Sequence, residues 1–284
     1  MNNMDITTKI KLSNGYEIPV LGYGTWRTAD GDEAVNSVAE AIRIGYRHID
    51  TAARYGNEVS VGEGIRRSGV DRRELFVTSK LWNTERGYDK AMRAFEKTLD
   101  DLGLEYLDLY LLHWPAVKNQ FDNWEEINLS SWKALTELYK AGRIKAIGVS
   151  NFYEHHLRAL METEIQPMVN QIEFHPGFMQ KETFSYCEKN GILIEAWAPL
   201  ARGQIFENET LVSIAQKHNK SIAQLCLRWC LQHNTVPLPK SVTPSRILQN
   251  TEIFDFEISD EDMAAIDALP FIGGSAHNSD LINF

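Results

Sequence analysis

The sequence predicts an α/β fold in which eight parallel strands close into a (β/α)8 TIM barrel. Strand-like and amphipathic helix-like segments alternate along almost the whole chain, and parallel strands need helical crossovers because tight turns cannot join them. Eight such units close most economically into a barrel. The strand candidates lie near residues 20–24, 46–50, 75–79, 107–113, 144–149, 167–172, 191–197 and 235–239. A chain of 284 residues suits such a barrel, so we expect a single domain over residues 1–284.

A β-hairpin is expected before the barrel. The segments Lys9–Leu12 and Tyr16–Pro19 flank the turn residues Ser13, Asn14 and Gly15. Asn-Gly is the preferred pair for a tight two-residue turn, because both positions tolerate positive φ angles. We therefore expect two short antiparallel strands joined at Asn14 and Gly15.

Helical segments follow the strand candidates, for example 31–44, 88–102, 130–141 and 154–163. In the first of them, Ala34, Val38 and Ala41 recur at helical spacing while charged residues occupy the other face. This pattern is typical of a helix that packs one face against a central sheet.

Composition and charge limit the classes of function. Hydrophobic residues make up 43% of the chain and charged residues 24%, as in ordinary globular proteins. The net charge of −10 argues against a nucleic-acid or anionic-membrane surface. No apolar run reaches membrane-spanning length, Met1–Asp5 lacks the basic start of a signal peptide, and the low cysteine count fits a reducing compartment. We expect a monomeric cytoplasmic protein in which Cys226 and Cys230 are packed thiols.

Polar side chains stand where several strand candidates end. Asp50 and Tyr55 lie where a short apolar run gives way to a loop, and Lys80 and His113 end two later runs. Because the active site of a TIM barrel forms at the C-terminal ends of its strands, these side chains should share one rim. The other polar or aromatic residues expected on this rim are Ser150, Asn151, Gln171, Trp197 and Lys240. Taken singly, Asp50 could cap a loop, Lys80 could be a solvated strand end, and His113 could be a buried structural histidine.

In their order and in their neighbouring residues, Asp50, Tyr55, Lys80 and His113 resemble the catalytic tetrad of the aldo-keto reductases. The similarity extends over almost the whole chain and recurs in Lys145–Phe152, Asn170–Gln171 and Leu238–Asn250. The resemblance implies an NADPH-dependent reductase of aldehydes and ketones. It also implies that the N-terminal hairpin covers one mouth of the barrel.

The resemblance assigns a role to each member of the tetrad. Tyr55 would act as the general acid that protonates the developing alkoxide when a hydride reaches the carbonyl carbon. Lys80 would lower the pKa of Tyr55 from its ordinary value of about 10, and Asp50 would pair with this ammonium and position it. His113 would hydrogen-bond the carbonyl oxygen of the substrate and orient it.

A cationic segment near the end of the chain favours NADPH over NADH. Lys240 and Arg246 carry positive charge close to the Ser241 hydroxyl. Thr243 and Pro244 are typical of an N-cap followed by proline at the first helical position. Free N–H groups at a helix start, flanked by cations, form an anion site. The segment resembles the family's pocket for the 2′-phosphate of NADPH.

The nicotinamide would be held at the mouth of the barrel. Trp197 resembles the aromatic residue on which the family stacks this ring. Ser150, Asn151 and Gln171 would hold the carboxamide group. The full set assigned to the cofactor is Gly24, Thr25, Trp26, Asp50, Ser150, Asn151, Gln171, Trp197, Pro199, Leu200, Arg202, Lys240, Ser241, Val242, Thr243, Arg246, Gln249 and Asn250.

The expected substrate pocket is apolar and aromatic, and its residues are Trp26, Tyr55, Trp82, His113 and Trp114. Such walls suit small aldehydes and diketones, which bind by burial with few polar contacts. The loop 115–123 and the tail 271–284 are short, which resembles prokaryotic members that reduce glyoxal, methylglyoxal and 2,5-diketo-gluconate-type substrates.

Two features depart from better-known relatives. Ala198 stands where the family often has serine, so one possible hydroxyl contact to the cofactor is missing. The segment Ala201–Asn208 is short for the belt that long-looped relatives fold over the cofactor. We therefore expect weak cofactor retention and a release that needs no slow loop opening.

Other functions are less well supported by the sequence. A non-catalytic NADPH-binding regulatory subunit could share the barrel, but the intact tetrad and the lack of an added docking segment disfavour it. A metal-dependent barrel hydrolase would need a ligand cluster. His155, His156 and His175 have no cysteine or carboxylate at metal-ligand spacing, so no metal site is expected.

Overall fold

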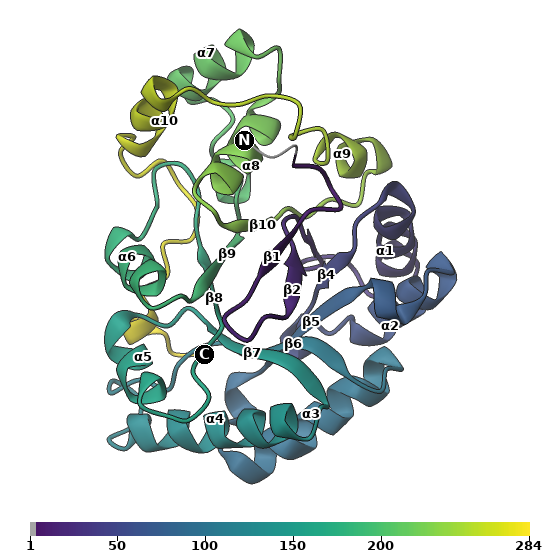
Figure 1. Cartoon of the computed structure of the whole chain (residues 1–284), viewed down its shortest axis with the longest axis vertical. Coiled ribbons are helices and arrows are strands. Elements are labelled where there is room, and N and C mark those ends of the chain that lie inside the picture. Colours follow the sequence, from purple (N-terminus) through teal and green to yellow (C-terminus); the bar gives the residue numbers. More distant parts are fainter. Residues whose placement is uncertain (1–3) are drawn as a thin grey trace.

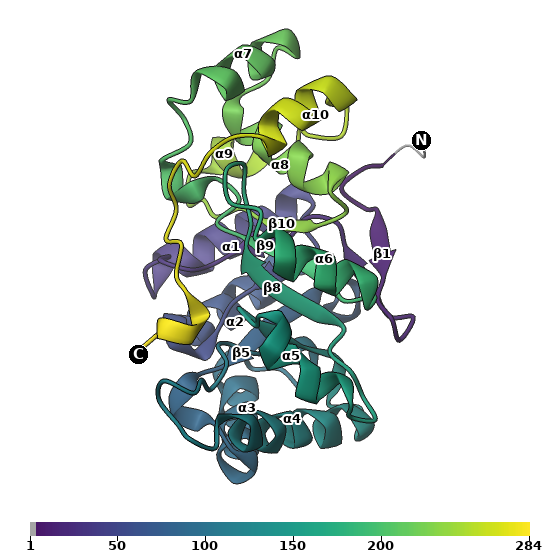
Figure 2. The same cartoon turned by 90° about the vertical axis from the view of Figure 1, so that its left-hand side faces the viewer.

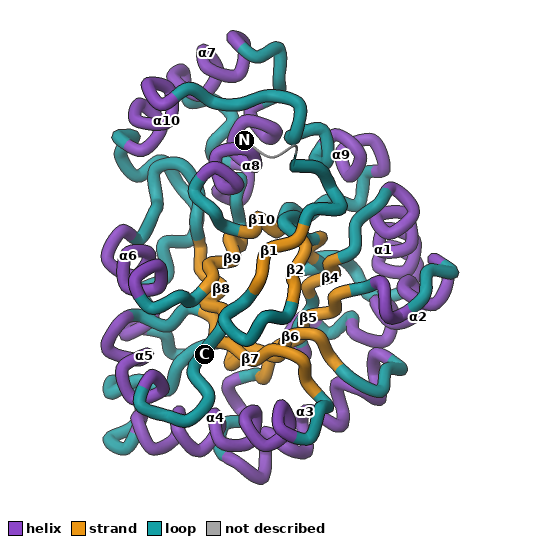
Figure 3. Tube along the Cα trace, viewed as in Figure 1, coloured by secondary structure: helices purple, strands orange, loops and turns teal. Residues whose placement is uncertain are grey.

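The computed structural model describes residues 4–284, and its eight parallel strands form a ring that helices surround (Figure 1 and Figure 3). The strands are β3 Tyr23–Gly24, β4 His48–Asp50, β5 Phe76–Leu81, β6 Leu107–Leu112, β7 Ile144–Ser150, β8 Val169–Glu173, β9 Leu193–Trp197 and β10 Val236–Leu238. Each strand pairs in parallel with the next. Backbone hydrogen bonds from Gly22 to Pro237 and from Gly24 to Pro239, of 3.1 and 3.0 Å, join the first and last strands. The predicted TIM barrel is confirmed.

Helices cross over between successive strands on the outside of the barrel (Figure 1). The crossover helices are α1 Asp32–Ile44, α2 Glu58–Ser68, α3 Tyr88–Leu102, α4 Trp124–Lys140, α5 Glu154–Met161, α6 Lys181–Lys189, α7 Glu209–Lys217 and α8 Ile222–Gln232. Two further helices, α9 Pro244–Gln249 and α10 Asp260–Asp267, follow the last strand. The apolar stripe predicted for the first helix is buried, since Ala34, Val38 and Ala41 are each 0% exposed. None of the helices in residues 4–284 combines the length and apolar character needed to traverse a bilayer.

Helix α4 begins at Trp124, well before the expected start at residue 130. Its first turns are polar and had the composition of a loop, but Glu125 and Glu126 favour the positive end of the helix dipole. Asn128 is buried and is satisfied by the backbone of Ala116, which donates to its Oδ1 at 2.7 Å and accepts from its Nδ2 at 3.0 Å. The polar side chains therefore anchor the preceding loop to the helix.

The N-terminal hairpin pairs β1, Lys9–Lys11, with β2, Glu17–Pro19, in antiparallel register. Tyr16 donates to Asp108 Oδ1 at 2.6 Å, and Asn14 Nδ2 donates to the carbonyl of Lys145 at 3.0 Å. Both partners stand at the N-terminal starts of barrel strands. The hairpin crosses this mouth in Figure 1, and Figure 2 shows it on the side opposite the C-terminal residues. The expectation that it closes one end is confirmed.

The expected two-residue turn of this hairpin is wrong. The loop has three residues, because the Leu12 N–H donates to the Tyr16 carbonyl at 2.8 Å and the Gly15 N–H donates to the Leu12 carbonyl at 2.8 Å. Only Gly15 has a positive φ, of 83°, as in a turn followed by a one-residue bulge. The side chain of Asn14 is engaged on the barrel wall instead.

The three cysteines Cys187, Cys226 and Cys230 are free thiols, and each is 0% exposed. Cys226 and Cys230 lie on the inner face of α8, as packed side chains, in agreement with the sequence-based expectation.

Candidate active site

Four side chains converge at the C-terminal ends of strands β4, β5 and β6. Asp50 ends β4, Tyr55 ends the short 3-10 helix η1, Ala53–Tyr55, Lys80 is the penultimate residue of β5, and His113 follows β6 directly. Lys80 Nζ lies 2.8 and 2.7 Å from the two carboxylate oxygens of Asp50 and 3.1 Å from the Tyr55 hydroxyl. The rings of Tyr55 and His113 meet edge to face with centroids 5.8 Å apart. The structure thus brings together the four residues that sequence reasoning selected.

Lys80 is a fully buried cation. Its Nζ also donates to the Thr51 carbonyl at 2.9 Å, so the ammonium is surrounded by acceptors. Burial alone lowers the pKa of Lys80, but the charge of Asp50 and the contact with Tyr55 raise it by more, and the net shift is upward. Lys80 therefore stays charged while it touches the phenol.

The pKa of Tyr55 differs from the expectation. Burial raises the pKa of the Tyr55 hydroxyl by more than the Lys80 charge lowers it, so the net shift is upward rather than downward. Desolvation disfavours a phenolate, and this effect outweighs the attraction of the neighbouring ammonium. The phenol is consequently protonated throughout the neutral range. The charge of Lys80 favours the phenolate at the moment when the proton is given away.

His113 is a neutral imidazole at the same mouth. Burial, together with the positive charges of Lys80 and Arg54, lowers its pKa well below the ordinary histidine value. Its Nδ1 is buried and has no hydrogen-bond partner within residues 4–284. The ring also meets the edge of Trp82 at 5.2 Å. A neutral ring of this kind can donate one hydrogen bond to a carbonyl oxygen without carrying a charge.

Amide and hydroxyl groups of β7, β8 and β9 form one network beside the tetrad. Ser150 Oγ donates to the Gln171 carbonyl at 2.8 Å, and Asn151 Nδ2 donates to the Ser150 Oγ at 2.9 Å and the His113 carbonyl at 3.1 Å. Trp197 Nε1 donates to Asn151 Oδ1 at 2.9 Å, which fixes the plane of its indole. The structure therefore holds these four predicted cofactor residues in a defined arrangement next to His113.

Glu195 and His48 also belong to the barrel interior, and sequence reasoning missed both. Gln171 Nε2 donates to Asp50 Oδ1 at 2.8 Å and to Glu195 Oε2 at 2.9 Å. His48 Nε2 lies 3.5 Å from Glu195 Oε1 and 3.0 Å from the Thr78 hydroxyl. The sequence could have indicated Glu195, because it is a charged residue inside a predicted strand and lies two residues before Trp197, so both side chains point to the same face of that strand.

The cationic segment after β10 has the exposed basic residues that were expected, but not the expected helix cap. Lys240 and Arg246 are exposed and form no ion pair within residues 4–284. Tyr23 donates to the Ser241 carbonyl at 2.6 Å and so fixes the start of the segment to the barrel. Thr243 and Pro244 occupy the N-cap and first helical positions of α9, but the Thr243 side chain caps no backbone N–H. The expected capping hydrogen bond is therefore absent, although the sequence correctly predicted where the helix begins.

The other residues of this segment that were assigned to the cofactor differ in their exposure to solvent. Val242 is half-buried, Gln249 is exposed, and Asn250 is buried at the C-terminal end of α9.

Residues 24–26 combine structural and exposed positions. A side chain at Gly24 would press on the Leu238 carbonyl oxygen at 3.2 Å, so this glycine allows the first and last strands to meet. The Thr25 hydroxyl donates to the Asp50 carbonyl at 3.0 Å. Trp26 is 37% exposed at the rim, where its ring is available to a ligand.

The loop after β9 reaches across to Trp26. The guanidinium of Arg202 lies 4.8 Å from the Trp26 ring and 5.8 Å from the Trp197 ring. Ala198 and Arg202 have positive φ angles of 49° and 55°, which side-chain-bearing residues adopt only with strain. Between them, Pro199 is buried and Leu200 is half-buried. This short strained loop places a single cationic side chain at the rim.

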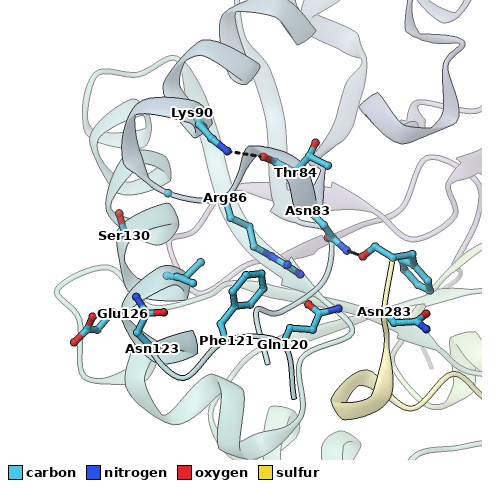
Figure 4. Close-up of a pocket in the computed structure, with 13 residues that line it drawn as sticks. Asn83, Thr84, Arg86, Lys90, Gln120, Phe121, Asn123, Glu126, Ser130 and Asn283 are labelled. Atoms are coloured by element: carbon cyan, nitrogen blue, oxygen red, sulfur yellow. Dashed lines mark hydrogen bonds between the residues drawn. The ribbon is translucent and has the colours of Figure 1, made fainter. Parts of the chain in front are cut away.

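Aromatic rings line the other side of the mouth. Phe284 stacks on Trp82 at 5.9 Å and meets the edge of Trp114 at 5.4 Å. Asn83 Nδ2 donates to the Phe284 carbonyl at 2.9 Å, and behind this contact lies a cavity of about 850 Å³ (Figure 4). The tetrad does not line this cavity, which is bounded by the starts of α3 and α4 and by Phe121 and Phe284.

His155 and His156 have no carboxylate at metal-ligand spacing in the sequence, but the fold brings a distant one to them. Asp280 Oδ1 lies 2.8 Å from His155 Nε2 and 3.0 Å from His156 Nε2. The two segments are so far apart in the sequence that metal-ligand spacing rules could not connect them. His156 Nδ1 accepts the backbone N–H of Tyr153 at 3.1 Å, so the ring carries its proton on Nε2, toward Asp280. A ring in this tautomer has no lone pair for a metal on that nitrogen. The cluster fastens the C-terminal tail to α5.

Comparisons with known proteins agree with this geometry, and the family model described as "Aldo/keto reductase family" matches residues 20–270. The glyoxal reductase of Bacillus subtilis is 55% identical over 261 residues, which cover 92% of each chain. A solved aldo-keto reductase from a Medee basin deep-sea metagenome library has a TM-score of 0.91 and 45% identity, covering 97% of this chain and 100% of that one. A Bombyx mori aldo-keto reductase solved in complex with NADP has a TM-score of 0.85 and 36% identity, covering 92% of each chain. The chain therefore belongs to the aldo/keto reductase family of oxidoreductases.

Proposed function

We propose that this enzyme reduces small aldehydes and ketones, 2-oxoaldehydes and diketones among them, to alcohols with NADPH. The observation that carries the proposal is the Tyr55 hydroxyl, held 3.1 Å from the Lys80 ammonium and beside the neutral ring of His113. A protonated phenol, a cation behind it and a neutral hydrogen-bond donor are the groups that carbonyl reduction needs.

The polar groups of the rim fit a dinucleotide cofactor. Gln171 donates from its Nε2 to Asp50 and Glu195, and its Oε1 accepts no hydrogen bond from residues 4–284. This free oxygen suits the N–H₂ of a carboxamide, and the hydroxyl of Ser150 and the amide of Asn151 belong to the hydrogen-bond network of the same residue. Lys240 and Arg246, which form no ion pair in the described part of the chain, suit a phosphate. The related silkworm enzyme solved with NADP supports the choice of cofactor.

When bound, NADPH supplies the hydride. In our proposed mechanism, His113 donates a hydrogen bond to the substrate carbonyl oxygen and orients it toward Tyr55. The Tyr55 hydroxyl transfers its proton to the same oxygen as negative charge develops there. Lys80 stabilises the resulting phenolate, and Asp50 keeps the ammonium in place with two hydrogen bonds. Tyr55 regains its proton from solvent through the open mouth.

Substrate size and chemistry follow from the aromatic walls. Trp26, Trp82 and Trp114 would contribute the apolar surface of the substrate pocket, so small carbonyl compounds would bind by burial rather than by specific polar contacts. The similarity to a glyoxal reductase supports 2-oxoaldehydes as members of the substrate range. We infer further that residues 1–284 act as one catalytic domain, as a monomer in the cytoplasm, without nucleic-acid or membrane partners.

The test is a panel of aldehydes, ketones and diketones, with glyoxal and methylglyoxal included, followed through NADPH absorbance. The wild type is run beside Tyr55→Phe, which retains the ring and lacks only the hydroxyl. We expect turnover on several small carbonyl compounds by the wild type. A wild type that binds NADPH tightly but reduces no member of the panel would instead support the non-catalytic regulatory subunit.

A further inference from the structure

A second buried carboxyl group lies inside the barrel, on a strand that contributes none of the tetrad. Glu195 is the middle residue of β9 and is 0% exposed. It approaches His48 of β4, a strand that is not adjacent to β9 in the sheet, so this contact crosses the barrel interior. Glu195 Oε1 has no hydrogen-bond donor within residues 4–284. The proposed mechanism uses neither Glu195 nor His48.

Glu195 fixes the orientation of Gln171. The two amide hydrogens of Gln171 are taken by two carboxyl groups, Asp50 at 2.8 Å and Glu195 at 2.9 Å. The amide plane is therefore held from both sides, and its oxygen is the one polar atom left for a ligand. Gln171 lies in register with Ser150 of β7 and Glu195 of β9, so the amide bridges the carboxyl group and the proposed carboxamide site.

The protonation of Glu195 decides the net charge of the group of side chains around it. Lys80 and Asp50 cancel as a bonded pair. Burial, and to a smaller extent the Lys80 charge, lower the pKa of His48 to about 3, so this ring is neutral. Tyr55 is protonated, β8 contributes the uncharged Gln171, and the paired strand β10 presents only the apolar segment Val236–Leu238. The groups next to Glu195 are thus neutral in sum when it is protonated, and carry one negative charge when it is ionised. Glu173, at the end of β8, is a separate buried carboxylate whose pKa is lowered and which Ser275 and Ala276 hold by hydrogen bonds.

Glu195 can change its charge in an accessible pH range. Burial, with a contribution from the charge of Asp50, raises the pKa of its carboxyl group to about 8. The lack of a donor at Oε1 agrees with a carboxyl group that is uncharged at neutral pH, because a buried carboxylate would need its oxygens satisfied.

We propose that Glu195 is a positioning residue that links the enzyme's preference for oxidised or reduced cofactor to pH through Gln171. The nicotinamide ring is cationic in NADP⁺ and neutral in NADPH. When Glu195 ionises, the negative charge behind Gln171 attracts the oxidised ring and leaves the affinity for the reduced ring nearly unchanged. Alkaline conditions therefore shift the enzyme toward NADP⁺ binding, and this inference rests on the cofactor site proposed above.

The experiment measures the dissociation constants of NADP⁺ and NADPH by tryptophan fluorescence from about pH 6 to about pH 9.5. The ratio of the two constants removes the titration of the 2′-phosphate, which both cofactors share. For the wild type, the ratio Kd(NADP⁺)/Kd(NADPH) should fall by about fivefold or more as pH rises through the pKa of Glu195, the scale of one charge partly screened by protein. In Glu195→Gln the ratio should be independent of pH.

Glu58→Gln is the matched control. Glu58 is also a buried carboxyl group, with a pKa raised to about 7 by burial, but it lies outside the barrel between α2, β5 and α3. This variant should keep the wild-type fall in the ratio. A fall that persists in Glu195→Gln, or that disappears in Glu58→Gln, would overturn the assignment.

A second measurement needs no variant. Calorimetry of the wild type near pH 8, in two buffers with different ionisation enthalpies, counts the protons released on binding. NADP⁺ binding should release a fraction of a proton, and NADPH binding should not. Equal proton release by both cofactors rejects the role of Glu195 while the proposed function stands. Failure of the proposed function would show differently, as a wild type that binds neither cofactor or that binds NADPH but reduces no member of the carbonyl panel.

Discussion

The ammonium group of Lys80 lies 3.1 Å from the hydroxyl of Tyr55. Burial keeps the proton on the phenol until a substrate is present, and the neighbouring cation lowers the energy of the phenolate that follows proton transfer. The same ammonium donates two hydrogen bonds to the Asp50 carboxylate, so the environment of the Tyr55 acid depends on a buried ion pair.

Removal of Lys80 alone should cost stability as well as activity. Lys80→Met leaves the Asp50 carboxylate buried beside Gln171 without its cation, and we expect a loss of about 3–5 kcal/mol in the free energy of unfolding. The double variant Lys80→Met/Asp50→Asn should regain most of this loss while reduction stays absent. Urea denaturation and NADPH oxidation measure the two effects. Equal stability of the single and double variants would show that the pair is not coupled.

The chemical step should be insensitive to pH over the neutral range. The pKa of Tyr55 is shifted upward from its ordinary value and that of His113 is shifted well below its own, so neither group changes charge between about pH 6 and about pH 9. In Glu195→Gln, which lacks the titration proposed above, kcat for methylglyoxal at saturating NADPH should be constant across this interval and fall only at strongly alkaline pH, as Tyr55 loses its proton. A change in kcat with an apparent pKa near 6.5 that disappears in His113→Asn would show that this imidazole titrates, which would contradict its neutral state.

The exposed cation Arg246 should discriminate between the two nicotinamide cofactors. Arg246→Ala should weaken NADPH binding by about tenfold, corresponding to about 1.4 kcal/mol, and leave NADH binding unchanged, because only NADPH carries a 2′-phosphate. Fluorescence titration with each cofactor measures this difference. Arg158→Ala is the control, since Arg158 is an exposed arginine paired with Glu154 on α5. If both variants weaken NADPH equally, the effect is one of overall charge.

Cofactor release should occur in one fast phase. The loop after β9 is short and contributes only the Arg202 side chain across the rim, so no long segment has to open. Arg202→Ala should speed NADPH dissociation by about threefold, because the rim loses the side chain that holds this loop to Trp26 and Trp197 by cation–π contacts. Stopped-flow fluorescence records the rate. A slow second phase in the wild type would point to a loop closure that the short segment was not expected to provide.

Glu58 should make stability depend on pH. Its folded pKa of about 7 lies above the unfolded value, so the stability it contributes is fully present below about pH 4.5 and is lost as pH rises through about 7. Glu58→Gln should therefore match the wild type near pH 5 and exceed it by roughly 1–3 kcal/mol near pH 8. Thermal unfolding at both pH values provides the test. A difference that does not change with pH would exclude titration of Glu58 as the cause.

The sequence predicts the parts of this molecule that depend on local pattern. The alternation of strands and helices predicts the barrel. Because a barrel places the C-terminal ends of its strands on one rim, the sequence alone predicts that Asp50, Lys80 and His113 lie close together. The start of α4 was misplaced because Asn128 is polar in sequence, and its burial depends on hydrogen bonds with Ala116 in another segment.

The rest of the site depends on contacts between distant segments and on burial. Glu195 meets His48 and Gln171 across the barrel, and Asp280 meets His155 across more than a hundred residues, so spacing rules could not find either cluster. The direction of the Tyr55 pKa shift likewise depends on a balance between desolvation and the Lys80 charge, and only the folded geometry sets that balance.

The hairpin of residues 9–19 and the aromatic mouth lie at opposite ends of the barrel (Figure 2). Affinity tags, surface-attachment linkers and fused partners added on the hairpin side would therefore be remote from the chemistry. The same additions after Phe284 would press on Trp82 and Trp114, so that immobilised or fused forms of the enzyme are best built from the N-terminal side.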